Sequence, residues 1–238
     1  CWLSCPYCYG ESATNNEERP STERLVEILN EIADGGVKKV TFAGWATDPL
    51  NSKSIDALLE TAIKRKMIFG FNTKPLKVSD KFVSVLKDNV INNQSWISLS
   101  IDSGSNEVFN KVHGMNTKAP LYDNVLKNVN RIKEANIPLR KFDISAAYLL
   151  NKFNSSRDEI KKFISDFKNA GCNLIRFSFA QPPRGLVNQE SIETVPQVQE
   201  KNKIMTELKD WINTFSDKNC KVLIIDPDTE NDIFYKDR

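Results

Sequence analysis

The sequence predicts an α/β protein with a parallel β-sheet, because short apolar runs alternate with amphipathic segments of ten or more residues. This alternation continues along the whole chain, as it does in consecutive βαβ units. The expected strands cover residues 37–43, 67–72, 96–102, 142–149, 174–179 and 221–225. The expected helices cover residues 21–34, 52–66, a stretch opening at Ser79, 120–135, a stretch opening at Ser156, and 196–216.

Helix boundaries follow from capping residues and breakers. The first expected helix, residues 21–34, has apolar residues at helical spacing from Leu25 to Ile32. Ser21 is its candidate N-cap, and Gly35 is its stop signal. The helix over 52–66 repeats the same spacing.

The later helices carry similar signals. Pro138 follows the helix expected over 120–135 and ends that unit. Ser156 and Glu159 have the spacing of a capping box, which predicts a helix start, and Gly171 predicts its end.

The strand expected over 96–102 decides between a doubly wound sheet and a barrel. It alternates strictly, so that one face carries the polar residues Ser98, Ser100 and Asp102. A parallel strand that is covered on both faces reads as a continuous apolar run instead. The polar face therefore favours a partly open barrel with a wet or ligand-filled interior, and a ligand site at the carboxyl ends of the strands.

Composition narrows the class of protein. Of the 238 residues, 40% are apolar and 27% charged, and the formal net charge is +2. The small charge excess argues against a dedicated nucleic-acid or anionic-membrane surface. No apolar run reaches the roughly 20 residues of a membrane span. The chain begins at Cys1 rather than Met and shows no signal peptide, so we expect a segment of a longer protein.

Three of the five cysteines, Cys1, Cys5 and Cys8, have the spacing C-x3-C-x2-C. An odd count with this clustering is not typical of a disulfide framework and indicates a thiolate-ligated cluster in a reducing compartment, hence the cytoplasm. Zinc sites and ferredoxin-type clusters usually take four protein ligands. Three thiolates on a four-iron cluster leave one iron open to a small molecule. A structural zinc loop and a chance grouping are the alternatives.

With an aromatic residue, Tyr7, before the last cysteine, the motif resembles the signature of radical S-adenosylmethionine (SAM) enzymes. The resemblance implies a [4Fe-4S] cluster held by Cys1, Cys5 and Cys8, and a SAM molecule with Tyr7 among its contacts. It also implies a partial (β/α)6 TIM-like barrel of the radical SAM type. The first strand of that barrel lies upstream of Cys1 and is absent from the segment.

Further SAM contacts follow from the resemblance. The turn containing Gly44, Trp45, Ala46 and Asp48 stands where the family holds the SAM amino group, and its carbonyls can accept from an ammonium. The turn has one glycine, and Asp48 stands where Glu is more usual. A plain strand-to-helix turn that ends at Pro49 is the alternative.

The polar ends of later strands supply the remaining candidates. Ser100 and Asp102 stand where related enzymes contact the SAM ribose, although helix capping is an equal alternative. Ser145 and Asn151 are candidates on the following strand. Arg176 can pair with the SAM carboxylate or a substrate anion, or it can be a buried structural ion-pair partner.

Four other residues are assigned without reference to the cofactors. His113 is the only histidine, and we expect a local structural role in a loop rather than proton transfer. Cys172 and Cys220 flank strands and are expected to be buried small apolar residues. Trp96, like Trp45, is expected to pack rather than to stack on a ligand.

The implied activity is reductive cleavage of SAM to a 5′-deoxyadenosyl radical that abstracts a hydrogen atom from a substrate. Residues 100–104 and 109–114 look most like the SPASM-domain subgroup, many of whose members modify peptides. The radical SAM core domain then spans residues 1–238, with 184–238 leading toward a C-terminal extension. The implied partners are SAM, an electron donor such as a flavodoxin or ferredoxin, and a peptide, with no membrane or nucleic acid expected. Alternatives are a small-molecule or RNA substrate, and a non-enzymatic iron-sulfur or zinc module.

Overall fold

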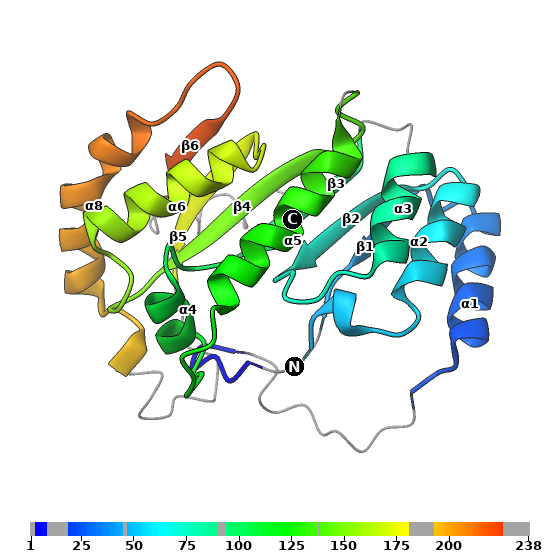
Figure 1. The fold of residues 1–238 in the computed structure, drawn as a ribbon, viewed down its shortest axis with the longest axis horizontal. Helices are drawn as coiled ribbons and strands as arrows, with labels where there is room; N and C mark the ends of the chain where they lie inside the picture. The colour runs from blue at the N-terminus through cyan, green and yellow to red at the C-terminus, as the bar shows by residue number, and fades with distance from the viewer. Residues whose placement is uncertain are drawn as a thin grey trace. The chain divides into compact units, whose positions relative to one another are not determined.

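The fold is an α/β arrangement around a parallel sheet (Figure 1). The computed structural model describes residues 3–8, 19–44, 47–89, 94–137, 139–180 and 193–225. Six strands follow the order β1-β2-β3-β4-β5-β6, and β1 and β6 are the open ends of this order. The strands run parallel along β1 to β3 and along β4 to β6. The predicted fold class is therefore confirmed.

The chain divides into two compact units. Unit 1 comprises Cys1–Trp2, Gly10–Leu99 and Asn124–Ile144, and unit 2 comprises Leu3–Tyr9, Ser100–Asp123 and Ser145–Arg238.

Unit 1 holds the first half of the sheet. Its strands are β1 (Lys39–Phe42), β2 (Ile68–Thr73) and β3 (Trp96–Ser100) up to Leu99. Its helices are α1 (Thr22–Asp34), the short 3-10 helix η2 (Pro49–Asn51), α2 (Ile55–Lys64), α3 (Asp80–Asn89) and most of α5 (Leu121–Asn136). In the register, Gly70 of β2 lies opposite Thr41 and Trp96. The Trp96 ring occupies the space that a side chain at Gly70 would need, in agreement with a packing role.

Aromatic side chains make up much of the unit 1 core. Phe42 of β1 stacks on Phe71 of β2 with ring centroids 4.9 Å apart, and Phe82 of α3 meets Phe71 edge-on at 5.2 Å. Phe71 and Phe82 are at most 1% exposed. These rings join two strands to a covering helix, and their burial supplies much of the hydrophobic stabilisation of this unit.

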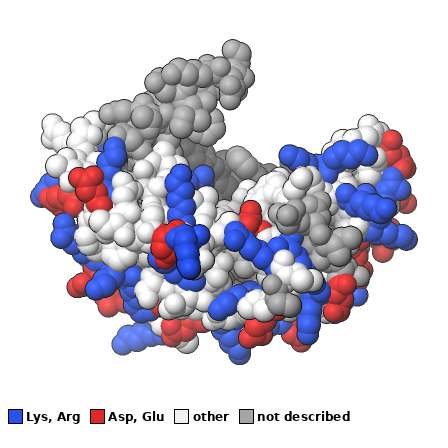
Figure 2. Space-filling model, turned by 90° about the horizontal axis from the view of Figure 1, so that it is seen from above, with Lys and Arg blue, Asp and Glu red and all other residues white. Residues whose placement is uncertain are grey.

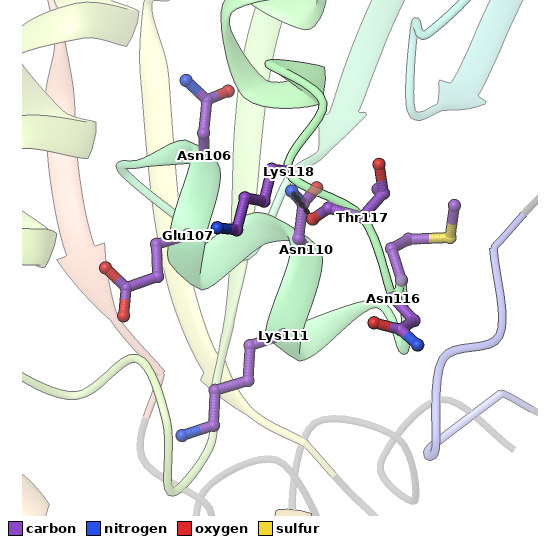
Figure 3. Close-up of a pocket in the computed structure, with 8 residues that line it drawn as sticks. Asn106, Glu107, Asn110, Lys111, Asn116, Thr117 and Lys118 are labelled. Atoms are coloured by element: carbon purple, nitrogen blue, oxygen red, sulfur yellow. Dashed lines mark hydrogen bonds between the residues drawn. The ribbon is translucent and has the colours of Figure 1, made fainter.

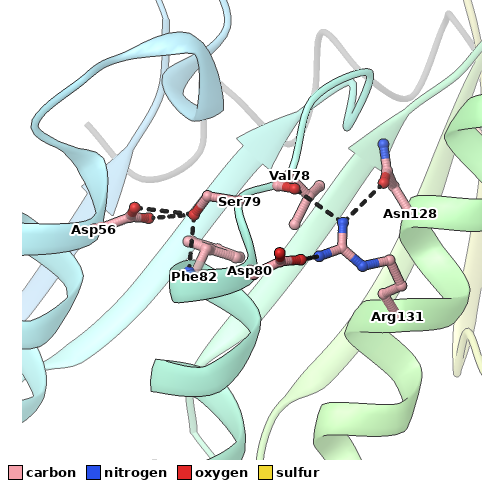
Figure 4. Close-up of polar contacts among 7 residues, drawn as sticks. All are labelled: Asp56, Val78, Ser79, Asp80, Phe82, Asn128 and Arg131. Atoms are coloured by element: carbon pink, nitrogen blue, oxygen red, sulfur yellow. Dashed lines mark hydrogen bonds and ion pairs between the residues drawn. The ribbon is translucent and has the colours of Figure 1, made fainter.

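The predicted helix start at Ser79 is confirmed. Hydrogen bonds and an ion pair also link the start of α3 to α2 and α5 (Figure 4). The Ser79 hydroxyl accepts from the amide of Phe82 and donates to the Asp56 carboxylate of α2, each at 2.9 Å. On the other side, Arg131 of α5 donates to the Val78 carbonyl at 2.9 Å and forms an ion pair with Asp80. The start of α3 is thus held from both neighbouring helices.

Unit 2 holds the second half of the sheet. Its strands are β4 (Asp143–Leu150) from Ser145 onward, β5 (Leu174–Phe179) and β6 (Lys221–Ile224). Its helices are α4 (Asn106–Val112), α6 (Arg157–Asn169) and α8 (Val198–Asn213). Its core includes Tyr148, Phe163 and Phe177, which are all fully buried. Cys172 and Cys220 are 3% and 2% exposed, so their predicted burial is confirmed.

The start of α6 corrects one prediction. The Ser156 hydroxyl accepts from the Glu159 amide at 3.4 Å, as expected of an N-cap. The Glu159 carboxylate, however, does not complete a capping box. It accepts from the Gly104 amide at 2.5 Å and from the Ser105 hydroxyl at 3.2 Å, because the chain before α4 approaches α6 closely.

Helix α4 was not predicted from the sequence. Its N-cap is Ser105, whose hydroxyl accepts from the Val108 amide at 3.3 Å. The helix is short, and it ends just before His113 and Gly114. It fills the connection between β3 and α5, which the sequence had left without an element.

The surface agrees with the small net charge. Lys and Arg side chains are intermixed with Asp and Glu side chains on the face that Figure 2 shows. Among the described residues, no helix has both the length and the apolar character to cross a membrane.

We predict that Ser79→Ala lowers the free energy of unfolding by about 1–2 kcal/mol, because it removes the N-cap of α3 and its bond to Asp56. The measurement is urea denaturation followed by circular dichroism. Ser84→Ala on the same helix is the matched control, since Ser84 is exposed and, among the described residues, its side chain bonds to Asp88 of α3 alone. We expect the control to change stability by less than about 0.5 kcal/mol. Equal effects of the two substitutions would contradict the role of Ser79.

Candidate cluster and cofactor site

The cluster loop, residues Leu3–Cys8, belongs to unit 2. Cys5 and Cys8 are partly exposed and form no disulfide, and a turn joins them, in which the Cys8 amide donates to the Cys5 carbonyl at 3.0 Å. The third predicted ligand, Cys1, lies outside the described residues. Within the described part of the chain, no three His, Cys, Asp or Glu side chains are grouped closely enough to hold a metal ion.

The backbone of the cluster loop rests on the residues that follow α4. The Ser4 amide donates to the His113 carbonyl at 3.0 Å. Gly114 has a φ of 63°, and a side chain there would collide with the Ser4 carbonyl oxygen. Both observations require glycine at this position. We call residues His113 and Gly114 the platform of the cluster loop.

His113 is fully buried, and both of its ring nitrogens are engaged. Nε2 lies 2.9 Å from the Ile101 carbonyl oxygen, which can only accept, so Nε2 carries a proton. Nδ1 faces the Cys5 Sγ at 3.2 Å and the Tyr7 hydroxyl at 3.4 Å. The edge of the ring packs on Phe109, with centroids 4.4 Å apart. His113 therefore contacts a predicted cluster ligand, which the sequence alone did not indicate.

Tyr7 joins the cluster loop to the end of β3. Its hydroxyl donates to Asp102 Oδ2 at 3.0 Å, and Asp102 Oδ1 accepts from the Leu149 amide of β4 at 2.7 Å. Asp102 is fully buried and has a φ of 62°. Burial and the nearby Asp102 carboxylate raise the pKa of Tyr7 well above its ordinary value, so the phenol remains a hydrogen-bond donor.

This geometry bears on the predicted ribose contacts. Strand β3 ends at Ser100, so its alternation does not extend to Asp102, which lies beyond the strand in a left-handed conformation. The Asp102 carboxylate contacts Tyr7 and β4 in the structure. Ser100, the last residue of β3, and Ser145, the third residue of β4, are both half-buried. The SAM contacts of Ser100, Asp102 and Ser145 remain predictions.

The turn after β4 contains an asparagine that sequence analysis missed. Asn154 donates to the Asp102 carbonyl at 2.8 Å and to the Leu149 carbonyl at 2.9 Å, and it accepts from the Asn151 amide at 2.8 Å. The predicted candidate Asn151 is fully buried, and its side chain accepts from the Phe153 amide at 2.9 Å. Two asparagines closely spaced after a strand are typical of such a turn, and this was the available signal.

Arg176 lies on β5, in register with Ala147 and Leu223. Its side chain is exposed, and no carboxylate among the described residues pairs with it. The alternative of a buried structural ion pair is therefore wrong. A role in binding a carboxylate or another anion remains a prediction.

In unit 1, the predicted turn for the SAM amino group is held by Asp48. Asp48 Oδ1 accepts from the Leu50 amide at 3.0 Å and the Thr73 hydroxyl at 2.7 Å, and Oδ2 accepts from the Lys74 amide at 2.5 Å. Burial raises the pKa of the Asp48 carboxyl, while these hydrogen bonds act in the opposite direction. Asp48 is thus the N-cap of η2 and fastens the turn to the end of β2.

The rest of that turn is only partly described. Gly44 lies so close to the Thr47 carbonyl that no side chain fits at this position. The other two predicted residues, Trp45 and Ala46, lie outside the described residues. The proposed contact of this turn with SAM stays a prediction.

A cavity of about 550 Å³ runs along α4 and the loop after it (Figure 3). None of the predicted site residues lines it. Asn110 is held here by its Nδ2, which donates to the carbonyls of Thr117 at 2.8 Å and Ala119 at 3.1 Å. These bonds stabilise the loop that begins at the platform.

The thiol groups of the described cluster loop fit an iron-sulfur cluster. Cys5 and Cys8 are partly exposed on a short loop, whereas Cys172 and Cys220 are buried. Burial raises the pKa of the Cys172 thiol, which disfavours the thiolate that a metal requires. The two cysteines of the cluster loop are therefore better placed as ligands than the two in the core.

Comparison with known proteins settles the family. The radical SAM superfamily profile matches residues 1–152. The chain belongs to the radical SAM superfamily. It is 26% identical over 188 residues to the sporulation killing factor maturation protein SkfB of Bacillus subtilis, covering 74% of this chain and 39% of SkfB. It is 29% identical over 178 residues to the probable GTP 3′,8-cyclase of Methanosarcina mazei, covering 71% and 48%. The chain thus spans less than half the length of these relatives.

Solved structures of one protein, SuiB, share the fold. Streptococcus suis SuiB superposes with a TM-score of 0.66 and 18% identity, covering 95% of this chain and 47% of SuiB. SuiB bound to SAM gives a TM-score of 0.63 with 17% identity, covering 94% and 47%. SuiB bound to its precursor peptide SuiA gives 0.62 with 18% identity, covering 90% and 44%. The radical SAM fold expected from the cysteine motif is therefore confirmed, and the chain is an enzyme of this class.

We predict that Asp102→Ala lowers the free energy of unfolding of the cluster-free protein by about 1–3 kcal/mol, because the partly buried Leu149 amide and the buried Tyr7 hydroxyl lose this acceptor. Asp102→Asn is the matched control. Asparagine keeps an acceptor for the Leu149 amide and tolerates the left-handed backbone, so its loss should be clearly smaller. Urea denaturation compares the two variants. An asparagine variant as unstable as the alanine variant would show that the hydrogen bonds do not explain the burial of Asp102.

Proposed function

We propose that the chain is the catalytic core of a radical SAM enzyme that modifies a peptide. When bound, a [4Fe-4S] cluster and SAM supply a 5′-deoxyadenosyl radical, through reductive cleavage of SAM, for hydrogen-atom abstraction from the substrate. The observation that carries the proposal is the cluster loop, in which Cys5 and Cys8 carry partly exposed thiols and the buried His113 contacts Ser4 and Cys5. Cys1, Cys5 and Cys8 are the proposed ligands.

The chain's own residues position the reactants. The proposed cofactor contacts are Tyr7, Gly44, Trp45, Ala46, Asp48, Ser100, Asp102, Ser145, Asn151 and Arg176. Asp48 and Asp102 act mainly by holding loops, because the hydrogen bonds described above occupy their carboxylates. The guanidinium group of Arg176 is exposed and can bind a carboxylate. Fixed loops keep the reacting groups in register and limit the access of water.

Two similarities support a peptide substrate. SkfB is named as a maturation protein of a sporulation killing factor, and SuiB was solved with a precursor peptide bound. A SPASM-type extension beyond this segment, a flavodoxin or ferredoxin as electron donor and a cytoplasmic location complete the proposal.

A nucleotide substrate is the second candidate, favoured by the similarity to the probable GTP 3′,8-cyclase. Transfer of deuterium from a labelled substrate to 5′-deoxyadenosine distinguishes the two candidate functions. The reconstituted full-length protein is incubated with SAM and either deuterated GTP or deuterated peptides from the neighbourhood of its own gene. Label in 5′-deoxyadenosine from the peptide supports peptide modification, and label from GTP alone supports the second candidate.

We predict that the full-length protein, reconstituted anaerobically with iron and sulfide and then reduced, forms 5′-deoxyadenosine from SAM. Replacing Cys1, Cys5 or Cys8 by Ala should reduce the product to background, because each loss removes a cluster ligand. Cys172→Ala is the matched control and should retain activity, since Cys172 is buried in the core. Product formation that survives the three ligand replacements would rule out the assignment.

A further inference from the structure

We propose that His113 is a positioning residue for the cluster loop: its backbone carbonyl holds the Ser4 amide, and its imidazole ring packs against the Cys5 side chain. This inference rests on the proposed function, because it assumes that Cys5 is a cluster ligand. It goes further by giving the single histidine of the chain a role at the metal, where the sequence indicated only a local structural role in a loop.

The first argument is that the imidazole ring has one orientation. Its Nε2 is anchored on the Ile101 carbonyl at 2.9 Å, just beyond the end of β3, and its ring edge packs on Phe109. The side chain is fully buried. Rotating the ring would break the Nε2 bond and leave a buried carbonyl without its donor. Nδ1 is therefore directed at the Cys5 Sγ, 3.2 Å away, by contacts that do not involve the cluster loop.

The second argument is that the same residue also holds the backbone of the loop. The His113 carbonyl accepts from the Ser4 amide, one residue before Cys5. Gly114 lets the Ser4 carbonyl approach, and no other residue type fits there. The main chain and side chain of the platform thus constrain two consecutive residues of the loop. Such a two-point contact fixes the position of the Cys5 sulfur more tightly than either contact alone.

The third argument concerns the alternative of proton transfer. A general acid or base must reach its substrate, and it needs a nitrogen that is open to the site. His113 is fully buried, with Nε2 on a carbonyl and Nδ1 on the loop. Side chains that contact a metal ligand rather than the metal orient that ligand and tune the metal. This is the role that the contacts of His113 match.

Two substitutions test the contacts of the two ring nitrogens of His113 separately. Glutamine reaches the position of Nε2, so His113→Gln keeps an amide donor for the Ile101 carbonyl but loses the group that faces Cys5. Asparagine reaches the position of Nδ1, so His113→Asn keeps a polar group at Cys5 but loses the Ile101 bond. Tyr122→Phe is the matched control, because it removes a partly buried hydrogen bond of unit 2, to Asp166 at 2.8 Å, away from the loop.

The experiment follows the visible absorbance of the reconstituted cluster in the full-length protein after addition of an iron chelator. We expect the cluster to be lost about 10-fold faster or more in His113→Gln. We expect His113→Asn to rescue most of this loss and Tyr122→Phe to behave like the wild type. A purely structural role predicts the opposite order, with His113→Asn the worse variant, because only that substitution breaks the buried Ile101 bond. That order, or equal rates in both variants, would overturn the proposal.

A second measurement works without a cluster. Amide hydrogen exchange of the peptide containing residues 3–8 should be several-fold faster in cluster-free His113→Gln than in the wild type, with α6 unchanged. Unchanged exchange in the loop would also overturn the inference. If the wild-type protein assembles no cluster, the proposed function fails, and the exchange measurement still decides whether His113 holds the loop.

Discussion

The docking of the cluster loop on buried polar groups is the constraint on which the candidate site depends. The loop is short, and Tyr7 is its one described residue with a fully buried polar contact, to Asp102. Tyr7 and Cys5 pack on an apolar cluster that includes Val112, Ala180 and Val195. Buried hydrogen bonds add to this packing and give it direction. Asp102 and His113 supply these hydrogen bonds, and Gly114 leaves room for the Ser4 carbonyl. Their positions therefore determine where the Cys5 and Cys8 sulfurs lie.

In each unit, a carboxylate links the chain after one strand to a backbone amide at the next strand. Asp48 follows β1 in unit 1 and accepts from the Lys74 amide at the end of β2. Asp102 follows β3 in unit 2 and accepts from the Leu149 amide of β4. In each case, a carboxylate after one strand binds a backbone donor of the next strand along the chain. Parallel strands bring such groups together at their carboxyl ends, where a barrel places its ligand site.

This arrangement separates residues that hold the site from residues that are available to a ligand. Carboxylates that looked like cofactor contacts in the sequence are occupied by the protein itself, whereas the side chain of Arg176 is exposed. A buried carboxylate with satisfied hydrogen bonds is rigid, and rigidity is what a loop carrying a metal cluster requires. The catalytic geometry proposed for this chain thus rests on groups that need not touch the substrate.

The sequence by itself determined the parallel α/β fold, the N-caps Ser21, Ser79 and Ser156, and the burial of Cys172 and Cys220. These features follow from periodic patterns and from residues close together in the chain, which act locally. The cysteine spacing, C-x3-C-x2-C, likewise pointed to the radical SAM superfamily, because its three ligands lie within eight residues.

Only the tertiary structure decided how the site is held. His113 meets Cys5 across 108 positions of sequence, and Tyr7 meets Asp102 across 95. The Glu159 carboxylate accepts from the Gly104 amide instead of completing the expected capping box, because α6 and the chain before α4 come together in the fold. No local pattern encodes such pairs, since each partner is an ordinary turn or capping residue until folding places the other beside it.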